Sequence, residues 1–236
     1  MKPGQRIIIA LDVKDKEKAI SLVKLLSRAE IFKIGYRLFI SQGIPILKAI
    51  QEFDKKIFLD LKLHDIPNTV AEAVKQAMRH KIFMLTLHSL GGKEMMTKAV
   101  EAAREEAEKL SLPQPKLLAV TILTSLKDEE LKEIGILNEV KDQVLKLASL
   151  AYQAGVDGIV CSPQEISLLR QHLGNEVLIV TPGVRPLWSV AYDQKRVMTP
   201  QDAVLKGADY LVIGRPIIAS PSPKKAFSKI IDEIKS

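Results

Sequence analysis

Charged side chains of alternating sign gather in the segment 60–69, which reads DLKLHDIPNT. Asp60 and Lys62 follow the apolar run 57–59, so in a strand they would project to the same face, about 6.6 Å apart. Asp65 arrives from the following turn, and cap-type residues then begin a helix. Burying such charges is unfavourable unless they pair with one another. The pattern therefore indicates either a structural ion pair at a strand end or a charged array built for chemistry, and the strand-to-helix turn favours the array.

Short apolar runs recur along the chain, and each is followed by a segment with helical periodicity. We expect eight strands, at 6–12, 31–36, 57–62, 82–88, 116–123, 158–161, 177–181 and 210–214. Eight strand–helix alternations without a long linker predict an α/β fold, a (β/α)8 TIM barrel formed by one domain of residues 1–236. The alternative is an open doubly wound sheet. That sheet would need a glycine-rich first turn for a nucleotide, and residues 10–13 read ALDV.

In such a barrel, functional groups lie at the C-terminal ends of the strands. The polar residues expected there are Asp12, Lys33, Asp60, Lys62, His88, Thr124, Ser125, Arg185, Gly214 and Arg215. The loops after the last two strands, 181–185 and 213–216, each combine glycine with arginine. Glycine lets the backbone approach an anion and a guanidinium supplies a fork of donors, so these loops predict a phosphate site.

Composition argues against several classes of protein. The net charge of +7 comes from basic residues scattered among 28 acidic ones, and aromatic residues make up only 5% of the chain, which disfavours a nucleic-acid partner. A mild cationic excess suits a small phosphorylated substrate. No apolar stretch approaches the roughly 18 to 20 residues of a membrane helix, and residues 1–6 lead directly into a strand, so we expect neither a membrane span nor a signal peptide.

The cysteine and histidine content bears on compartment and metal binding. Cys161 is the lone cysteine, which excludes an internal disulfide and predicts a buried structural thiol in the reducing cytoplasm. His64, His80, His88 and His172 stand apart from one another, so we expect no metal site. No cofactor motif is present either, and we expect no cofactor.

The segments described above resemble the orotidine 5′-phosphate decarboxylase family over nearly the whole chain. The most specific match is 60–69, and the matches that corroborate it by order and spacing are 8–12, 33–35, 120–125, 160–165, 181–186, 193–197 and 213–216. The resemblance implies conversion of orotidine 5′-phosphate to UMP and CO2 in pyrimidine biosynthesis, without a cofactor. It also implies a homodimer in which each active site is shared across the interface.

The resemblance further implies a role for each site residue. Lys62 would protonate C6 of the pyrimidine, Asp60 would lie near the departing carboxylate beside Lys33, and Asp65 would complete the array from the other subunit. Asp12 and Lys33 would contact the ribose, with Asp65 and Thr69 reaching across the interface. The other implied substrate-binding residues are Thr124 and Ser125 at the pyrimidine, Gln194, Gly214 and Arg215 at the phosphate, Arg185 at the base of a closing loop, and Ile66, Pro67 and Pro182.

Some positions depart from the family pattern or have a packing role. His64 is expected to pack rather than react, and Arg196 to form a structural salt bridge. The family usually reads NVHA at the end of strand four, whereas residues 86–89 here read TLHS, which affects local packing. Trp188 and Tyr192 are bulkier than the small polar residues common in the loop 186–193, so closing kinetics are expected to differ.

Two other functions fit parts of the pattern. A metal-dependent sugar-phosphate decarboxylase or aldolase of the same superfamily, such as hexulose-phosphate synthase, would share the D-x-K-x-x-D string. A non-catalytic module that binds phosphate or nucleic acid would share the basic loops, but it gives no reason for a buried charge array.

Overall fold

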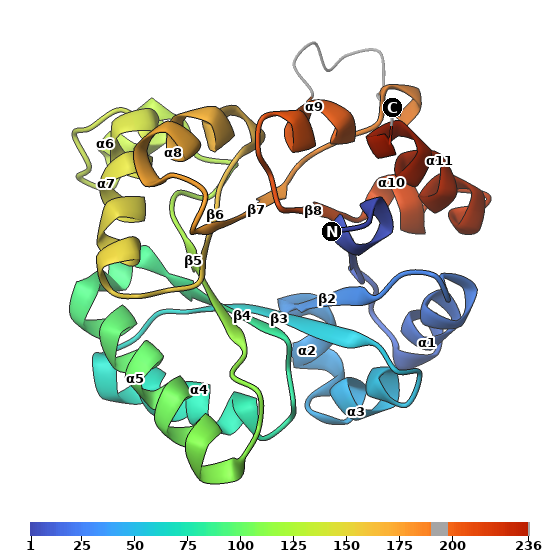
Figure 1. The fold of residues 1–236 in the computed structure, drawn as a ribbon, viewed down its shortest axis with the longest axis horizontal. Helices are drawn as coiled ribbons and strands as arrows, with labels where there is room; N and C mark the ends of the chain where they lie inside the picture. Colours follow the sequence, from blue (N-terminus) through green and yellow to red (C-terminus); the bar gives the residue numbers. More distant parts are fainter. Residues whose placement is uncertain (190–197, 236) are drawn as a thin grey trace.

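A computed structural model describes residues 1–189 and 198–235. Within these residues, eight parallel strands close into a barrel in the order β1 to β8, with helices arranged around it (Figure 1). The strands are β1 Ile7–Ala10, β2 Ile31–Gly35, β3 Lys56–Leu63, β4 Met84–His88, β5 Lys116–Val120, β6 Gly158–Val160, β7 Leu178–Pro182 and β8 Tyr210–Ile213. The predicted α/β fold, a (β/α)8 TIM barrel, is confirmed.

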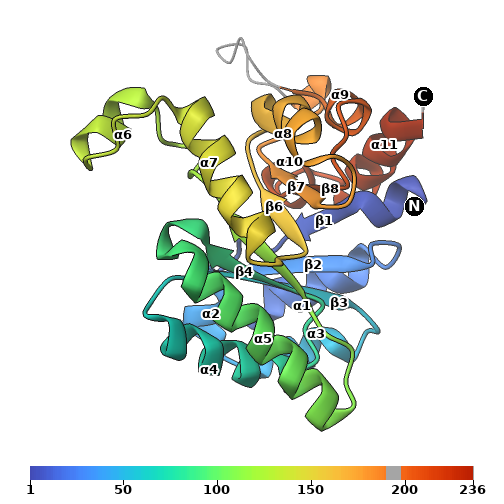
Figure 2. The same cartoon turned by 60° about the vertical axis from the view of Figure 1, so that its left-hand side comes forward.

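Helices follow the strands along the chain and cover the outside of the barrel. The α-helices are α1 Lys16–Leu25, α2 Tyr36–Gln42, α3 Pro45–Gln51, α4 Pro67–Met78, α5 Gly92–Leu110, α6 Asp128–Glu133, α7 Val140–Gln153, α8 Ile166–Leu173, α9 Pro200–Leu205, α10 Arg215–Ile218 and α11 Pro223–Lys235. Figure 2 shows α4 and α5 side by side below β3 and β4. Across the described part of the chain, no helix has the length and apolar character needed to cross a bilayer.

Several strands end earlier than the sequence pattern predicts. The first ends at Ala10 rather than at residue 12, and the fifth ends at Val120 rather than at residue 123. Beyond these ends the chain turns into loops at the barrel mouth, as at 123–126, where the Leu126 amide donates to the Leu123 carbonyl at 2.9 Å. By contrast, β3 runs one residue further than predicted, to Leu63.

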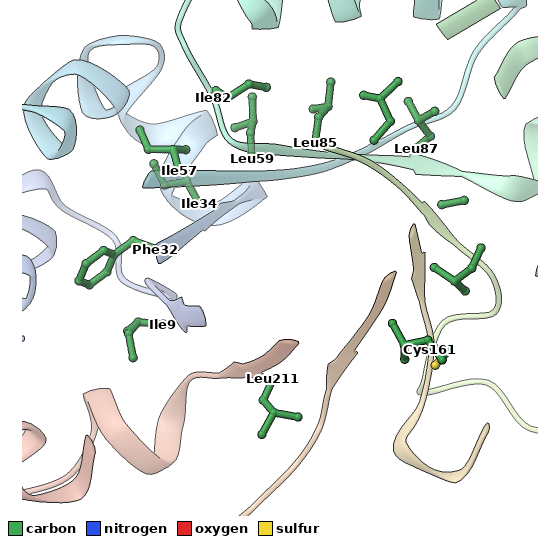
Figure 3. Packing of buried hydrophobic residues seen from close by; sticks show 14 of the residues in the cluster. Ile9, Phe32, Ile34, Ile57, Leu59, Ile82, Leu85, Leu87, Cys161 and Leu211 are labelled. Carbon is green, nitrogen blue, oxygen red and sulfur yellow. The ribbon is translucent and has the colours of Figure 1, made fainter. Parts of the chain in front are cut away.

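Alternation along the strands divides the apolar core into two parts. Side chains such as Ile8, Phe58 and Met84 fill the barrel interior. Their neighbours, including Ile9 and Leu59, point outward to pack under the helices (Figure 3). Burial of each side chain of this size contributes about 1.5–3 kcal/mol to the stability of the fold. The two parts of the core together support the loops at the barrel mouth.

Cys161 belongs to the outer core and is buried (Figure 3). Burial raises the pKa of its thiol, with a smaller contribution from the nearby Glu165. A buried thiol with a raised pKa is unreactive, because the thiolate is the nucleophilic form. The sequence prediction of a structural thiol is confirmed.

Candidate active site

An alternating chain of charges crosses the ends of β1, β2 and β3. The Nζ of Lys33 lies 3.5 Å from Asp12 Oδ1 and 3.3 Å from Asp60 Oδ2. The Nζ of Lys62 lies 2.8 Å from Asp60 Oδ1. The three strands are hydrogen-bonded neighbours, with Gly35 opposite Asp60. The structure thus brings together four residues that the sequence analysis placed at neighbouring strand ends.

The strand that carries Asp60 and Lys62 is irregular. Leu59 of β3 pairs with Leu85 of β4 and Leu63 pairs with Leu87, so three β3 residues, 60–62, lie opposite Thr86 alone. Such a bulge bends a strand and re-aims its side chains. Lys62 has a φ of 42°, in the left-handed region. The regular alternation assumed from sequence therefore does not hold, and the two charges converge through the bulge.

Two side chains from neighbouring elements contact this bulge. The Thr86 hydroxyl accepts a hydrogen bond from the Lys62 amide at 2.8 Å and donates one to Asp60 Oδ1 at 3.0 Å. The Tyr36 hydroxyl donates to the Leu61 carbonyl, and the Lys62 ammonium lies 5.8 Å from the centroid of the Tyr36 ring. Sequence reasoning missed both residues. The available signal for Thr86 was one hydroxyl in the apolar stretch of β4.

Asp60 is the most buried carboxylate of the array, with a side chain 13% exposed. Burial alone would raise its pKa, but the charges of Lys33 and Lys62 and hydrogen bonds from Lys62 and Thr86 lower it below the ordinary value of 3.8. Asp60 is therefore ionised at neutral pH. Burial, and then the charge of Asp60, raises the pKa of Tyr36.

The charge chain opens into a cavity of about 330 Å³ at the barrel mouth. Of the predicted site residues, those that line it are Asp12, Lys33, Asp60, Lys62, Thr124, Pro182, Arg185, Gly214 and Arg215. The charges of the array and the two arginines of the predicted phosphate loops thus share one space, sized for a small ligand.

The other predicted site residues that the structure describes do not line this cavity. Ile66, Pro67 and Thr69 begin α4, and Ile66 is 67% exposed. The Asp65 carboxylate accepts a hydrogen bond from the Ile66 amide at 2.7 Å, and within the described residues it forms no ion pair. Ser125 is exposed in the turn after β5. Gln194, Tyr192 and Arg196 lie outside the described residues.

The two histidines near Lys62 stack on each other. The rings of His64 and His88 have centroids 5.4 Å apart and planes inclined by 23°. Burial, followed by the charges of His64 and Lys62, lowers the pKa of His88 to about 4. The contact agrees with the packing role predicted for His64. Among the described residues, no three His, Cys, Asp or Glu side chains are placed to hold a metal ion.

Comparison with known proteins places the chain in a family. A profile of the orotidine 5′-phosphate decarboxylase / HUMPS family matches residues 5–230. The chain belongs to this family. A relative from Geotalea daltonii is 50% identical over 97% of this chain and 95% of its own length. Another from Gloeothece citriformis is 47% identical over 98% of both chains. Both are named orotidine 5′-phosphate decarboxylase.

A solved structure agrees with these sequence comparisons. The crystal structure of orotidine 5′-phosphate decarboxylase from Lactobacillus acidophilus superposes with a TM-score of 0.87 at 36% identity, covering 98% of this chain and all of that one. The family and the enzyme class predicted from the sequence are confirmed. The relatives carry the decarboxylase name, which favours this class over the metal-dependent sugar-phosphate alternative.

Proposed function

We propose that this protein converts orotidine 5′-phosphate to UMP and CO2 in the cytoplasm, as a single domain of residues 1–236. The observation that carries the proposal is the Lys62 ammonium, held 2.8 Å from Asp60 in a cavity that also contains Arg185 and Arg215. A fixed ammonium and a pair of guanidinium groups in one cavity match a ligand that carries both a reacting carboxylate and a phosphate.

The reaction breaks the bond between C6 and the carboxylate and leaves its electron pair on C6. The pyrimidine offers this pair no obvious electron sink, so its stabilisation must be electrostatic. The Lys62 ammonium would stabilise the developing charge and then transfer a proton to C6. Because Asp60 already holds this ammonium, little reorganisation is needed during the reaction.

Asp60 would also face the substrate carboxylate. Two unit charges about 4 Å apart, at an effective dielectric near 20, interact by roughly 4 kcal/mol. Loss of CO2 relieves this repulsion. At the other end, Arg215, the Gly214 backbone and Gln194 would hold the phosphate, with Arg185 at the loop base. The binding energy of this remote group would orient the ring over Lys62.

We infer that the working site needs a second copy of the chain. Asp65 is exposed at the start of α4 and forms no ion pair with the described residues of its own chain. The adjacent Ile66 is 67% exposed, and Leu90, beside His88 at the end of β4, is 40% exposed. An isologous dimer would cover them and bring the partner's Asp65 to Lys62.

Mixing two inactive variants tests this arrangement. Lys62→Met and Asp65→Asn each disable both sites of a homodimer. In a mixed dimer, one site would combine an intact Lys62 with an intact Asp65, so random mixing should restore about a quarter of wild-type activity. If Asp65 acts within its own chain, mixing restores nothing.

The activity itself is tested by incubating the purified protein with orotidine 5′-phosphate and following the ultraviolet absorbance of the substrate. We expect full turnover in excess chelator, whereas the metal-dependent alternative predicts its loss. Lys62→Ala should abolish turnover. Lys56→Ala, at the exposed start of the same strand, is the matched control and should leave it unchanged. Turnover that survives in Lys62→Ala would refute the proposal.

A further inference from the structure

Thr86 carries a fully buried hydroxyl in the middle of β4, where it stands between Leu85 and Leu87 in the sequence. Buried hydroxyls need partners, and most find a backbone carbonyl. Two hydroxyls on nearby strand ends do so: Ser89 donates to the Val120 carbonyl at 2.7 Å, and Thr121 donates to the Val160 carbonyl at 3.2 Å. Thr86 bonds instead to the charged array.

Both hydrogen-bonding functions of the Thr86 hydroxyl are used. It accepts from the Lys62 amide at 2.8 Å and donates to Asp60 Oδ1 at 3.0 Å. The same Oδ1 accepts from the Lys62 ammonium at 2.8 Å. One oxygen atom of Thr86 thus joins the backbone of Lys62 to the carboxylate that holds its side chain.

The bulge explains why this position matters. Residues 60–62 have only Thr86 opposite them on β4, so the β3–β4 ladder does not hold their backbone in regular register. On the other side of β3, the register with β2 reaches Asp60 and no further. Lys62 is also in the left-handed region, which a side chain other than glycine adopts only where the surroundings impose it. The Thr86 hydroxyl supplies an acceptor to the Lys62 amide at the strained residue.

We propose that Thr86 is a positioning residue, which fixes Asp60 and the Lys62 backbone relative to each other so that the ammonium is aimed into the cavity. The inference rests on the proposed decarboxylation. A group at this position must both donate and accept a hydrogen bond. Serine meets this requirement, and valine, of nearly the same shape, meets neither part.

The role has a consequence for the pH profile. Burial raises the pKa of Asp60, the two lysines lower it, and the hydrogen bond from Thr86 lowers it further. Removing the hydroxyl therefore moves the acid limb of the kcat profile to higher pH. A role in packing alone would leave that limb in place.

The test compares Thr86→Val and Thr86→Ser, with Thr121→Val as the matched control. Thr121 is equally buried, and the Val160 carbonyl it contacts keeps the Thr121 amide as a donor. For Thr86→Val we expect kcat to fall about 10- to 100-fold, as for a lost hydrogen bond to a charged group. KM should stay near its wild-type value. Thr86→Ser should retain kcat within about threefold, and Thr121→Val should behave as wild type.

Wild-type kcat and an unmoved acid limb in Thr86→Val would overturn the inference, as would a loss in Thr86→Ser equal to that in Thr86→Val. Should Thr86→Val fail to fold, Thr86→Cys retains a weak donor and acceptor, and its acid limb must then lie above that of wild type. Titration of the Asp60 carboxyl by carbon-13 NMR needs no turnover. It therefore separates failure of this inference from failure of the proposed function, which the wild-type assay reports.

Discussion

Removing the Lys33 charge tests the electrostatic reasoning most directly. The Lys33 ammonium lies 3.3 Å from Asp60 Oδ2, and the two side chains are 12% and 13% exposed. At an effective dielectric near 20, the Coulomb attraction at this distance is about 5 kcal/mol. Relaxation and water reduce the measured effect, and a neighbouring charge typically moves a carboxyl pKa by about 1–3. Lys33→Met removes the cation and leaves an unbranched apolar side chain that is one heavy atom shorter.

The direction follows from the groups around Asp60. Burial raises its pKa, and Lys33 and Lys62 together with two hydrogen bonds outweigh burial. Without the Lys33 charge, which makes the largest contribution that lowers it, the pKa of Asp60 should rise. A carboxylate whose pKa is lowered in the folded protein stabilises the fold at pH values above its unfolded pKa, here 3.8. That stability is lost as the pH falls through the folded-state pKa. Lys33→Met should therefore also lower the free energy of unfolding at neutral pH.

Two measurements check this prediction. Carbon-13 NMR reports the titration of the Asp60 carboxyl, and the pH dependence of kcat/KM reports the ionisation needed for turnover. Lys56→Met is the control, since Lys56 begins the same strand and pairs with Glu30 at 3.7 Å with both side chains largely exposed. An Asp60 titration in Lys33→Met that matches wild type would refute the reasoning. An equal shift in the control would do the same.

Three further substitutions test other parts of the structure. The pKa of His88 lies at about 4, below its ordinary 6.5, so wild type should lose up to about 3 kcal/mol of stability as the pH falls from 6.5 to 4. His88→Leu should flatten that loss in urea titrations, and an unchanged slope would contradict the assignment. Arg79→Ala removes the guanidinium 3.0 Å from the buried Glu106 and should cost about 1–3 kcal/mol in urea unfolding. A Cβ at Gly35 would lie 3.0 Å from Lys33 Nζ and would displace this ammonium, so Gly35→Ala should lower kcat about tenfold without lowering Tm. A kcat equal to that of wild type in Gly35→Ala would contradict the role of Lys33 in the charged array.

The fold was predictable because its signals are local. Each strand is a short apolar run, and the two cores require only that successive side chains alternate between the barrel interior and the helices. Strand ends were less predictable. Ile122 continues the apolar run after Val120 and is buried, yet it lies outside the sheet. Hydrophobicity reports burial, and burial alone does not distinguish a strand from a packed loop at the barrel mouth.

The candidate site was predictable to the extent that its charges are adjacent in sequence or at matching strand ends. Asp60 and Lys62 share one motif, and Lys33 lies in the neighbouring strand, two residues before its end. The contribution of Thr86 was not predictable in this way, because it depends on the register between β3 and β4. A single sequence carries no information about that register, and the hydroxyl in β4 gives only a weak signal.

The bulge also accounts for the strain at Lys62. In a regular strand, side chains two residues apart stand about 6.6 Å apart, and Thr86 would pair with a single residue of β3. The bulge instead brings the Asp60 carboxylate and the Lys62 amide to one hydroxyl and places the ammonium 2.8 Å from that carboxylate. Left-handed backbone at a lysine costs about 1–3 kcal/mol. The hydrogen bond from the Lys62 amide to Thr86, the one from Tyr36 to the Leu61 carbonyl and the ion pair to Asp60 are of the size needed to offset it. The irregularity thus lies where the charges must converge, and the regular part of the barrel holds it there.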